Sequence, residues 1–175
     1  MKLYTRWAKR EYPLAVRLLF TLPAGILFVY LIPLMLIRLG PRLDSALHLP
    51  HLFFGIPNLV VGGLFMLTGA FYAQWSIVSQ FSQADGTPLP VMATQKLLIG
   101  GPFKQCRNPM SFGTIALYLG ITILVGSLSS LAIVILLASL LIFYLKRVEE
   151  RELEARFGQE YLDYKARTPF IIPRM

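Results

Sequence analysis

The sequence predicts an all-α integral membrane protein with about four transmembrane helices, the last two forming a tight hairpin, followed by a C-terminal amphipathic helix. More than half of the 175 residues are apolar, only 15% are charged, and the mean hydropathy is +0.60. A soluble domain of this length could not bury so much apolar surface. The apolar residues also gather in long charge-free runs with basic residues at their edges. We expect residues 1–175 to form a single domain.

The first two predicted spans cover residues 18–37 and 54–79. A helix of about 20 residues is long enough to cross the hydrocarbon core of a bilayer. The first run contains Pro23 and Pro33, where we expect kinks. The second run carries several glycines, which allow neighbouring helices to approach closely in lipid.

The third and fourth predicted spans share one charge-free stretch from Pro109 to Leu145. This stretch is too long for one span and long enough for two short ones. Gly126 and the serines that follow it predict a turn over residues 126–130. We therefore expect helices over 110–125 and 131–145.

The tail after residue 145 has the pattern of an amphipathic helix rather than a span. Leu153, Phe157, Tyr161 and Tyr164 recur at helical spacing, with charged residues between them. Gly158 interrupts the pattern and weakens the helix at that point.

The distribution of basic residues predicts that both termini lie in the cytosol. Positively charged flanks stay inside, and five lie before the first span: Lys2, Arg6, Lys9, Arg10 and Arg17. This orientation places the 80–108 loop and the tail on the same cytosolic face. The short loops favour a prokaryotic inner membrane. The net charge of +8 sits at membrane edges, so we expect membrane lipids as partners and no nucleic acid.

Two features are candidates for chemistry. One is the Gly/Pro-rich loop over residues 86–110, whose backbone cannot be regular helix throughout. The other is the pair Glu149 and Glu150, directly after the last span, because carboxylates beside a membrane span are functional candidates. Simpler interpretations remain open: the loop is a connector, the glutamates pair with nearby basic residues, or Asn108 only caps the third span.

A metal site is not expected. The two histidines, His48 and His51, lie on the opposite face from the loop, and Cys106 is the only cysteine.

The loop and the tail share a set of short motifs in a fixed order. They are Gly101-Pro102-Phe103, Arg107-Asn108-Pro109-Met110, Gly113, Glu149-Glu150, Phe157-Gly158, Tyr161, Tyr164, Pro169 and Pro173. In these motifs the chain resembles a membrane methyltransferase superfamily that includes isoprenylcysteine carboxyl methyltransferase and phospholipid N-methyltransferases. The resemblance covers roughly residues 85–173. Asn108 follows the phospholipid branch, since the prenylcysteine enzymes carry His there, and Ser111 and Gln105 replace usual aromatic residues.

The resemblance implies methyl transfer from S-adenosylmethionine, giving S-adenosylhomocysteine, to a lipid-like substrate that enters from the bilayer. The acceptor is a prenylcysteine carboxylate, a phospholipid amine or a phenolic lipid hydroxyl. Ser111 and Gln105 favour the alternative, a non-catalytic membrane scaffold or binding protein with the family fold. By resemblance, the cofactor region spans residues 86–173. The implied catalytic residues are Arg107, Asn108 and Glu150, and the implied cofactor-binding residues are Gln95, Lys96, Leu97, Leu98, Phe103, Asn108, Pro109, Met110, Ser111, Glu149 and Glu150.

Overall fold

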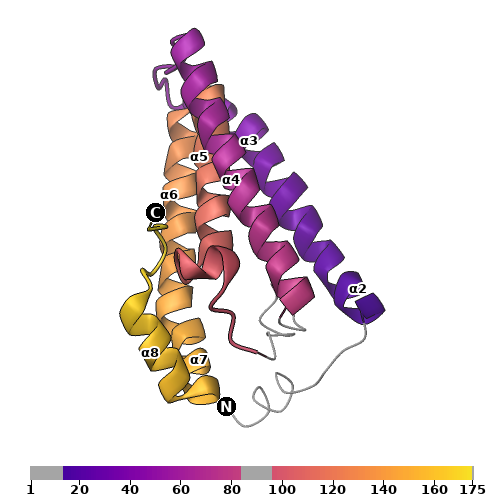
Figure 1. Ribbon diagram of the computed structural model, residues 1–175. Helices are drawn as coiled ribbons and strands as arrows, with labels where there is room; N and C mark the ends of the chain where they lie inside the picture. Colours follow the sequence, from indigo (N-terminus) through magenta and orange to yellow (C-terminus); the bar gives the residue numbers. More distant parts are fainter. Residues whose placement is uncertain (1–13, 84–95, 175) are drawn as a thin grey trace.

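The computed structural model describes residues 14–83 and 96–174, and the regular secondary structure in these ranges is entirely helical. Figure 1 shows the long helices lying side by side, with two short C-terminal helices at one end of the bundle. Within these ranges, three helices are long and apolar enough to cross a membrane: Thr21–Ala46, Ile56–Gln83 and Leu128–Phe157. A shorter apolar helix covers Pro109–Val125. The predicted class, an all-α integral membrane protein, is confirmed.

In the part of the chain that the structure describes, two π-helical segments and one 3₁₀ turn lie between the α-helices. In chain order, the elements are α2 (Leu14–Gly25), η1 (Ile26–Leu31), α3 (Ile32–Ala46), α4 (Ile56–Gln83), η3 (Gly101–Lys104), α5 (Pro109–Val125), α6 (Leu128–Tyr144), η4 (Leu145–Glu149), α7 (Glu150–Phe157) and α8 (Gln159–Arg167).

The helix that contains the first predicted span is longer than expected. It does not end at residue 37 but continues as α3 to Ala46. The prediction stopped at the first charged residue, Arg38, yet this side chain is exposed and leaves the helical backbone undisturbed. The π-helical segment η1 directly precedes α3, where Pro33 has no N–H to donate to the regular ladder.

The hairpin turn is shorter than predicted. Gly126 adopts a left-handed conformation (φ 66°) that ends α5, and Ser127 caps α6 by accepting a hydrogen bond from the Ser130 amide. Residues 128–130, expected in the turn, therefore form the first turn of α6. The last helix does not end at residue 145 either, because η4 joins α6 to α7 without a break.

Glycines allow α4 and α5 to cross in close contact. A Cβ on Gly69 would lie 2.4 Å from the Leu117 amide nitrogen, and one on Gly113 would lie 2.5 Å from the Ala73 amide nitrogen. No real side chain tolerates such distances, so only glycine fits at these crossings. Small residues are the usual means of close helix packing in lipid, where apolar burial supplies no driving force.

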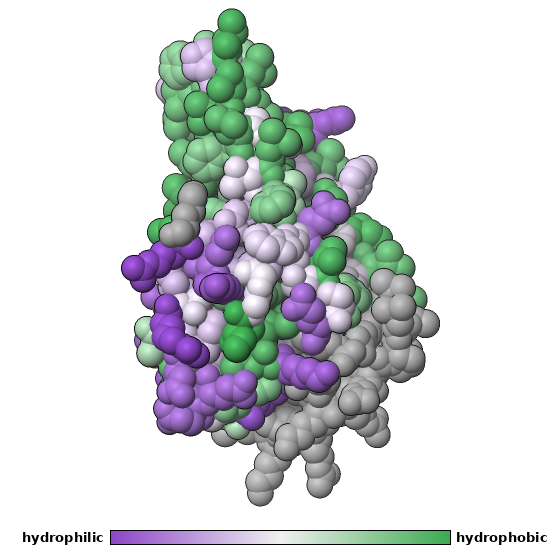
Figure 2. All heavy atoms as spheres, in the orientation of Figure 1, coloured by the Kyte–Doolittle hydropathy of each residue, from purple (hydrophilic) through white to green (hydrophobic). Residues whose placement is uncertain are grey.

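Polar groups fasten α3 to the hairpin at the end of the bundle where α5 and α6 meet. The Ser130 hydroxyl donates to the Leu36 carbonyl at 2.7 Å. The Asp44 carboxylate accepts from the Ser129 amide at 2.8 Å, which satisfies a free N–H at the start of α6. Figure 2 shows hydrophobic residues over the upper part of the molecule and polar residues gathered over α7 and α8. The polar end is where the candidate site lies.

Candidate functional site at the junction of loop and tail

The loop that precedes α5 places Arg107 beside the C-terminal part of the chain. Gly101 has a φ of 56°, a left-handed conformation that starts the short turn η3. Pro102 and Phe103 are buried in this turn. The chain then passes through Arg107 and Asn108 and enters α5 at Pro109, which occupies the first helical turn without needing an N–H partner.

Arg107 is the centre of the junction. Its Nη1 atom lies 2.5 Å from Glu150 Oε1 and donates a longer hydrogen bond, 3.5 Å, to the Tyr161 hydroxyl. Its Nε atom donates to the Thr168 carbonyl at 3.1 Å. One guanidinium therefore connects the loop with α7, α8 and the segment after α8. The fork-like donor arrangement of arginine suits such a multiple contact.

Glu150 accepts from two cations at once. Its second oxygen, Oε2, lies 2.7 Å from Lys165 Nζ, and the same ammonium group lies 2.7 Å from Glu154 Oε1. The hydrogen bonds to Glu150 and then Glu154 raise the pKa of Lys165 above its ordinary value. Lys165 therefore stays charged at neutral pH and places a second cation beside Glu150.

The segment over residues 168–174, which we call the terminal strap, runs along the loop. The Arg107 amide donates to the Pro169 carbonyl at 2.8 Å, and the Arg174 amide donates to the Gln105 carbonyl at 2.9 Å. The Asn108 side-chain amide donates to the Phe170 carbonyl at 2.9 Å. The loop and the strap are therefore joined by both backbone and side-chain hydrogen bonds.

Aromatic residues complete the junction. The Phe170 ring lies 5.5 Å from the Arg107 guanidinium carbon and 4.9 Å from Lys146 Nζ, measured to the ring centroid. The buried Tyr164 hydroxyl donates to the Phe103 carbonyl at 2.7 Å. Its burial raises the pKa of Tyr164 well above the ordinary value, so the hydroxyl remains a donor.

The structure brings together Arg107, Asn108 and Glu150, the three implied catalytic residues, at this junction. Asn108 occupies the N-cap position of α5, but its side chain makes no cap bond and contacts the strap instead. Glu150 pairs with distant cations rather than with the basic residues beside it in the sequence. The interpretation of Glu150 as a solvated charge paired with those neighbours is therefore wrong.

The residues that the resemblance implies for cofactor binding fall in several segments of the chain. Gln95 lies outside the described residues. Lys96 is exposed, and Leu97 and Leu98 are half-buried in the irregular segment before η3. Met110 and Ser111 are half-buried in the first turn of α5, after the buried Pro109.

Glu149 differs from its neighbour. Its side chain is half-buried, and its carboxylate forms no hydrogen bond or ion pair with any residue in the described part of the chain. Adjacent residues on a helix point about 100° apart, so the two carboxylates face different directions. The wide turn η4 accommodates one extra residue and thereby sets the register in which Glu150 faces Arg107. The Glu149 carboxylate is left without a partner in the described residues.

Sequence reasoning missed several residues of the junction. Lys165, Thr168 and Phe170 were not candidates because they belong to a tail whose charges and apolar positions matched a surface helix. A signal was available in the sequence: two tyrosines three residues apart, followed by a proline-bounded apolar segment, exceed what a surface helix needs. The position of the strap over the loop could not be predicted from spacing.

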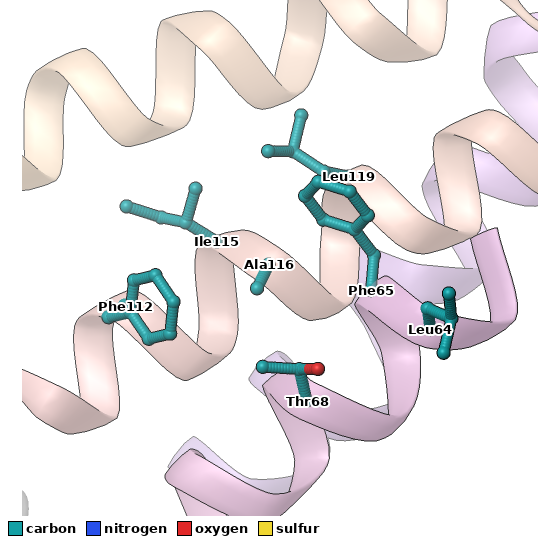
Figure 3. A pocket seen from close by; sticks show the side chains of 7 residues that line it. All are labelled: Leu64, Phe65, Thr68, Phe112, Ile115, Ala116 and Leu119. Carbon is teal, nitrogen blue, oxygen red and sulfur yellow. The ribbon is translucent and has the colours of Figure 1, made fainter. Parts of the chain in front are cut away.

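An apolar groove lined by α4 and α5 begins near this junction. The Tyr72 hydroxyl donates to the Gln105 side chain at 2.5 Å, and the Tyr72 ring meets the Phe112 ring edge-on with centroids 5.1 Å apart. From Phe112 an open apolar groove of about 390 Å³ follows α4 and α5 (Figure 3). Thr68 is the single polar residue among its lining residues Leu64, Phe65, Thr68, Phe112, Ile115, Ala116 and Leu119.

The fold and the junction together define an integral membrane protein with a charged site at one end of its helices and an apolar groove leading toward that site. Comparison with family models matches residues 57–160 to the phospholipid methyltransferase family. The match covers more than half of the chain, so the protein belongs to this family, whose members transfer methyl groups to lipid-like substrates. No curated protein sequence and no solved structure matches the chain.

Proposed function

We propose that the protein transfers a methyl group from S-adenosylmethionine to a membrane-embedded lipid-like acceptor. The observation that carries this proposal is the junction at Arg107, where the loop, α7, α8 and the strap meet around one buried ion pair. When bound, this cofactor supplies an activated methyl group on a sulfonium. Methyl transfer needs alignment more than proton transfer, so a rigid site provides much of the rate gain.

The residues present fit such a cofactor. The unpaired carboxylate of Glu149 suits a cationic or hydroxyl group, since charge-assisted hydrogen bonds are strong. We assign the surrounding contacts to residues 95–98, Phe103 and 108–111. Glu150 and Arg107 have their charges satisfied by each other and by the tail, which favours a role in holding the loop in position. Asn108 holds the strap in the same way.

We further propose that the apolar part of the acceptor lies in the groove between α4 and α5. The groove is open at the surface of the helix bundle and reaches Phe112, one turn after Asn108 and Pro109. Its apolar lining suits an alkyl or prenyl chain. Family membership favours a phospholipid amine over a prenylcysteine carboxylate or a phenolic hydroxyl.

We also propose that both termini lie in the cytosol, in a prokaryotic inner membrane. In this orientation the junction would face the compartment that supplies the cofactor.

Calorimetry with S-adenosylhomocysteine in detergent tests the cofactor assignment. We expect micromolar binding by the wild type and roughly 10- to 100-fold weaker binding by Glu149→Gln, since one charge-assisted hydrogen bond contributes about 1.5–3 kcal/mol. Glu160→Gln, an exposed glutamate on α8, is the matched control and should bind as the wild type does. Equal binding by Glu149→Gln would remove that residue from the site.

The alternative function is a non-catalytic scaffold. It is favoured by the two cations that already occupy Glu150 and by Ser111 and Gln105, where related enzymes carry aromatic residues. Absence of heat with millimolar S-adenosylhomocysteine would support the scaffold. Transfer of a labelled methyl group from S-adenosylmethionine into the organic-soluble fraction of membrane vesicles would exclude it.

A further inference from the structure

Two arginines on α3 lie at the end of the bundle opposite the candidate site. Arg38 and Arg42 follow Leu36, whose carbonyl accepts the Ser130 hydroxyl, and flank Gly40. A Cβ at Gly40 would lie 2.9 Å or closer to the hydroxyl oxygens of Ser127 and Ser130. These contacts place the arginines at the level of the hairpin turn, where α5 ends and α6 begins. That level marks one boundary of the apolar bundle.

No acidic side chain in the described part of the chain neutralises the charges of these arginines. Both side chains are exposed, and neither forms an ion pair or a side-chain hydrogen bond with any residue in 14–83 or 96–174. Asp44 lies on the same helix, but its carboxylate is buried and accepts from the Ser129 amide at the start of α6. Residues four apart on a helix are neighbours, and like charges at this spacing repel. An anion between the two guanidinium groups would relieve the repulsion.

The surface beside the arginines is apolar and hollowed. An open hollow of about 500 Å³ runs along α3 and η1, with Arg38 and Arg42 at one end and Tyr30 toward the other. Between them the lining is aliphatic, contributed by Leu31, Leu34, Met35 and Leu39. Because the residues 30, 34, 38 and 42 are each four apart, they follow one face of the helix. A ligand for this face must combine an anionic group with an apolar chain.

We propose that Arg38 and Arg42 bind the headgroup phosphate of an anionic phospholipid, whose acyl chain lies along the aliphatic part of the hollow. Arginine guanidinium groups at a membrane boundary contact phosphate through paired hydrogen bonds, while their apolar stems remain in the lipid. Free phosphate would satisfy the charges but not the hollow, and a neutral lipid would satisfy the hollow but not the charges. The site lies outside residues 57–160 and far from the junction, so it is separate from the proposed methyl-transfer site.

Native mass spectrometry of the full-length protein tests this proposal without any activity measurement. The purified protein is titrated in detergent with phosphatidylglycerol or phosphatidylcholine of identical acyl chains. We expect one phosphatidylglycerol bound roughly tenfold more tightly than phosphatidylcholine, because each basic group near an anionic lipid adds a modest attraction. The variant Arg38→Gln/Arg42→Gln should lose this preference, and Arg38→Lys/Arg42→Lys should keep part of it.

The matched control is Arg151→Gln/Arg167→Gln, which removes the same charge at the opposite end of the helix bundle. It should keep the wild-type preference for phosphatidylglycerol over phosphatidylcholine. Thermal unfolding of each variant in detergent establishes that it is folded. Equal binding of the two lipids by the wild type would overturn the proposal, and so would an unchanged preference after Arg38→Gln/Arg42→Gln. Competition by millimolar inorganic phosphate that abolishes lipid binding would assign the site to free phosphate. A dimer that is lost in the same variant, without lipid, would assign the face to a second copy of the chain.

Discussion

Replacing Glu150 by glutamine should release the terminal strap from the loop. The substitution keeps the shape of the side chain but removes the charge that faces Arg107 at 2.5 Å. Both side chains of this pair are nearly buried, with exposed fractions of 11% and 12%. Removing one partner of a buried pair costs about 3–5 kcal/mol. Because the glutamine oxygen can still accept a hydrogen bond, we expect a cost near the lower limit.

The second contact of Glu150, to Lys165, adds little to this free-energy cost. Lys165 is 34% exposed, and ion pairs exposed to water contribute about 0–1 kcal/mol. The free energy of local opening at the junction should therefore fall by about 3 kcal/mol in Glu150→Gln. At 1.4 kcal/mol per factor of ten, this free energy corresponds to roughly 100-fold faster hydrogen exchange of the amides that the local opening exposes.

Hydrogen exchange measured by mass spectrometry reports this opening directly. The amides of Arg107 and Arg174 donate hydrogen bonds between the loop and the strap, so peptides that contain them should exchange about 100-fold faster in the variant. Glu154→Gln is the matched control, because it removes only one exposed contact to Lys165 and should change exchange less than about fivefold. Unchanged exchange in Glu150→Gln, or an equal effect of both variants, would refute the role assigned to the Arg107 pair.

Three further predictions concern packing, capping and reactivity. Gly69→Ala should lower the free energy of unfolding by about 1–3 kcal/mol because the α4–α5 crossing has no room for a Cβ. Gly63→Ala, whose added Cβ meets no neighbour, should raise the free energy of unfolding by up to about 1 kcal/mol. Thermal unfolding in detergent compares the two variants. Asp44→Ala should cost about 1–3 kcal/mol by leaving an amide of α6 unpaired, while the exposed Ser45→Ala should change stability by less than about 0.5 kcal/mol in the same assay. Burial raises the pKa of the Cys106 thiol to about 11, so the thiol stays protonated until high pH. Alkylation at pH 8 should therefore be at least roughly 100-fold slower in the folded protein than after denaturation. Comparable alkylation rates would contradict this burial.

Hydropathy was sufficient to predict the membrane helices but not their ends. Charge-free runs located the helices because the cost of placing a charge in hydrocarbon is large. The same rule ended the first helix too early at Arg38, since an arginine at a membrane boundary can remain in a helix and extend toward phosphate. The predicted turn also included Ser129, because of its residue type. Serine favours turns when its backbone lacks a partner, but here Asp44, 85 residues away, accepts from its amide.

The sequence predicted that both glutamates belong to the candidate site, but not which of them pairs with Arg107. Glu149 and Glu150 are chemically identical neighbours, and both were expected to contact the cofactor. Consecutive helix residues point about 100° apart, and η4 sets the register between α6 and α7 in which Glu150 faces Arg107. This local feature carries no composition signal in the sequence. Arg107 then selects the carboxylate that faces it, and the other remains unpaired. A deletion of one residue within 145–148 would test this reasoning, since a regular helix would turn the face of α7 by about 100°. Such a variant should lose the exchange protection of the strap, as Glu150→Gln does, although both glutamates and Arg107 are still present. Retained protection would mean that the strap and the tyrosines of α8, rather than the Arg107 pair, determine how the tail meets the loop.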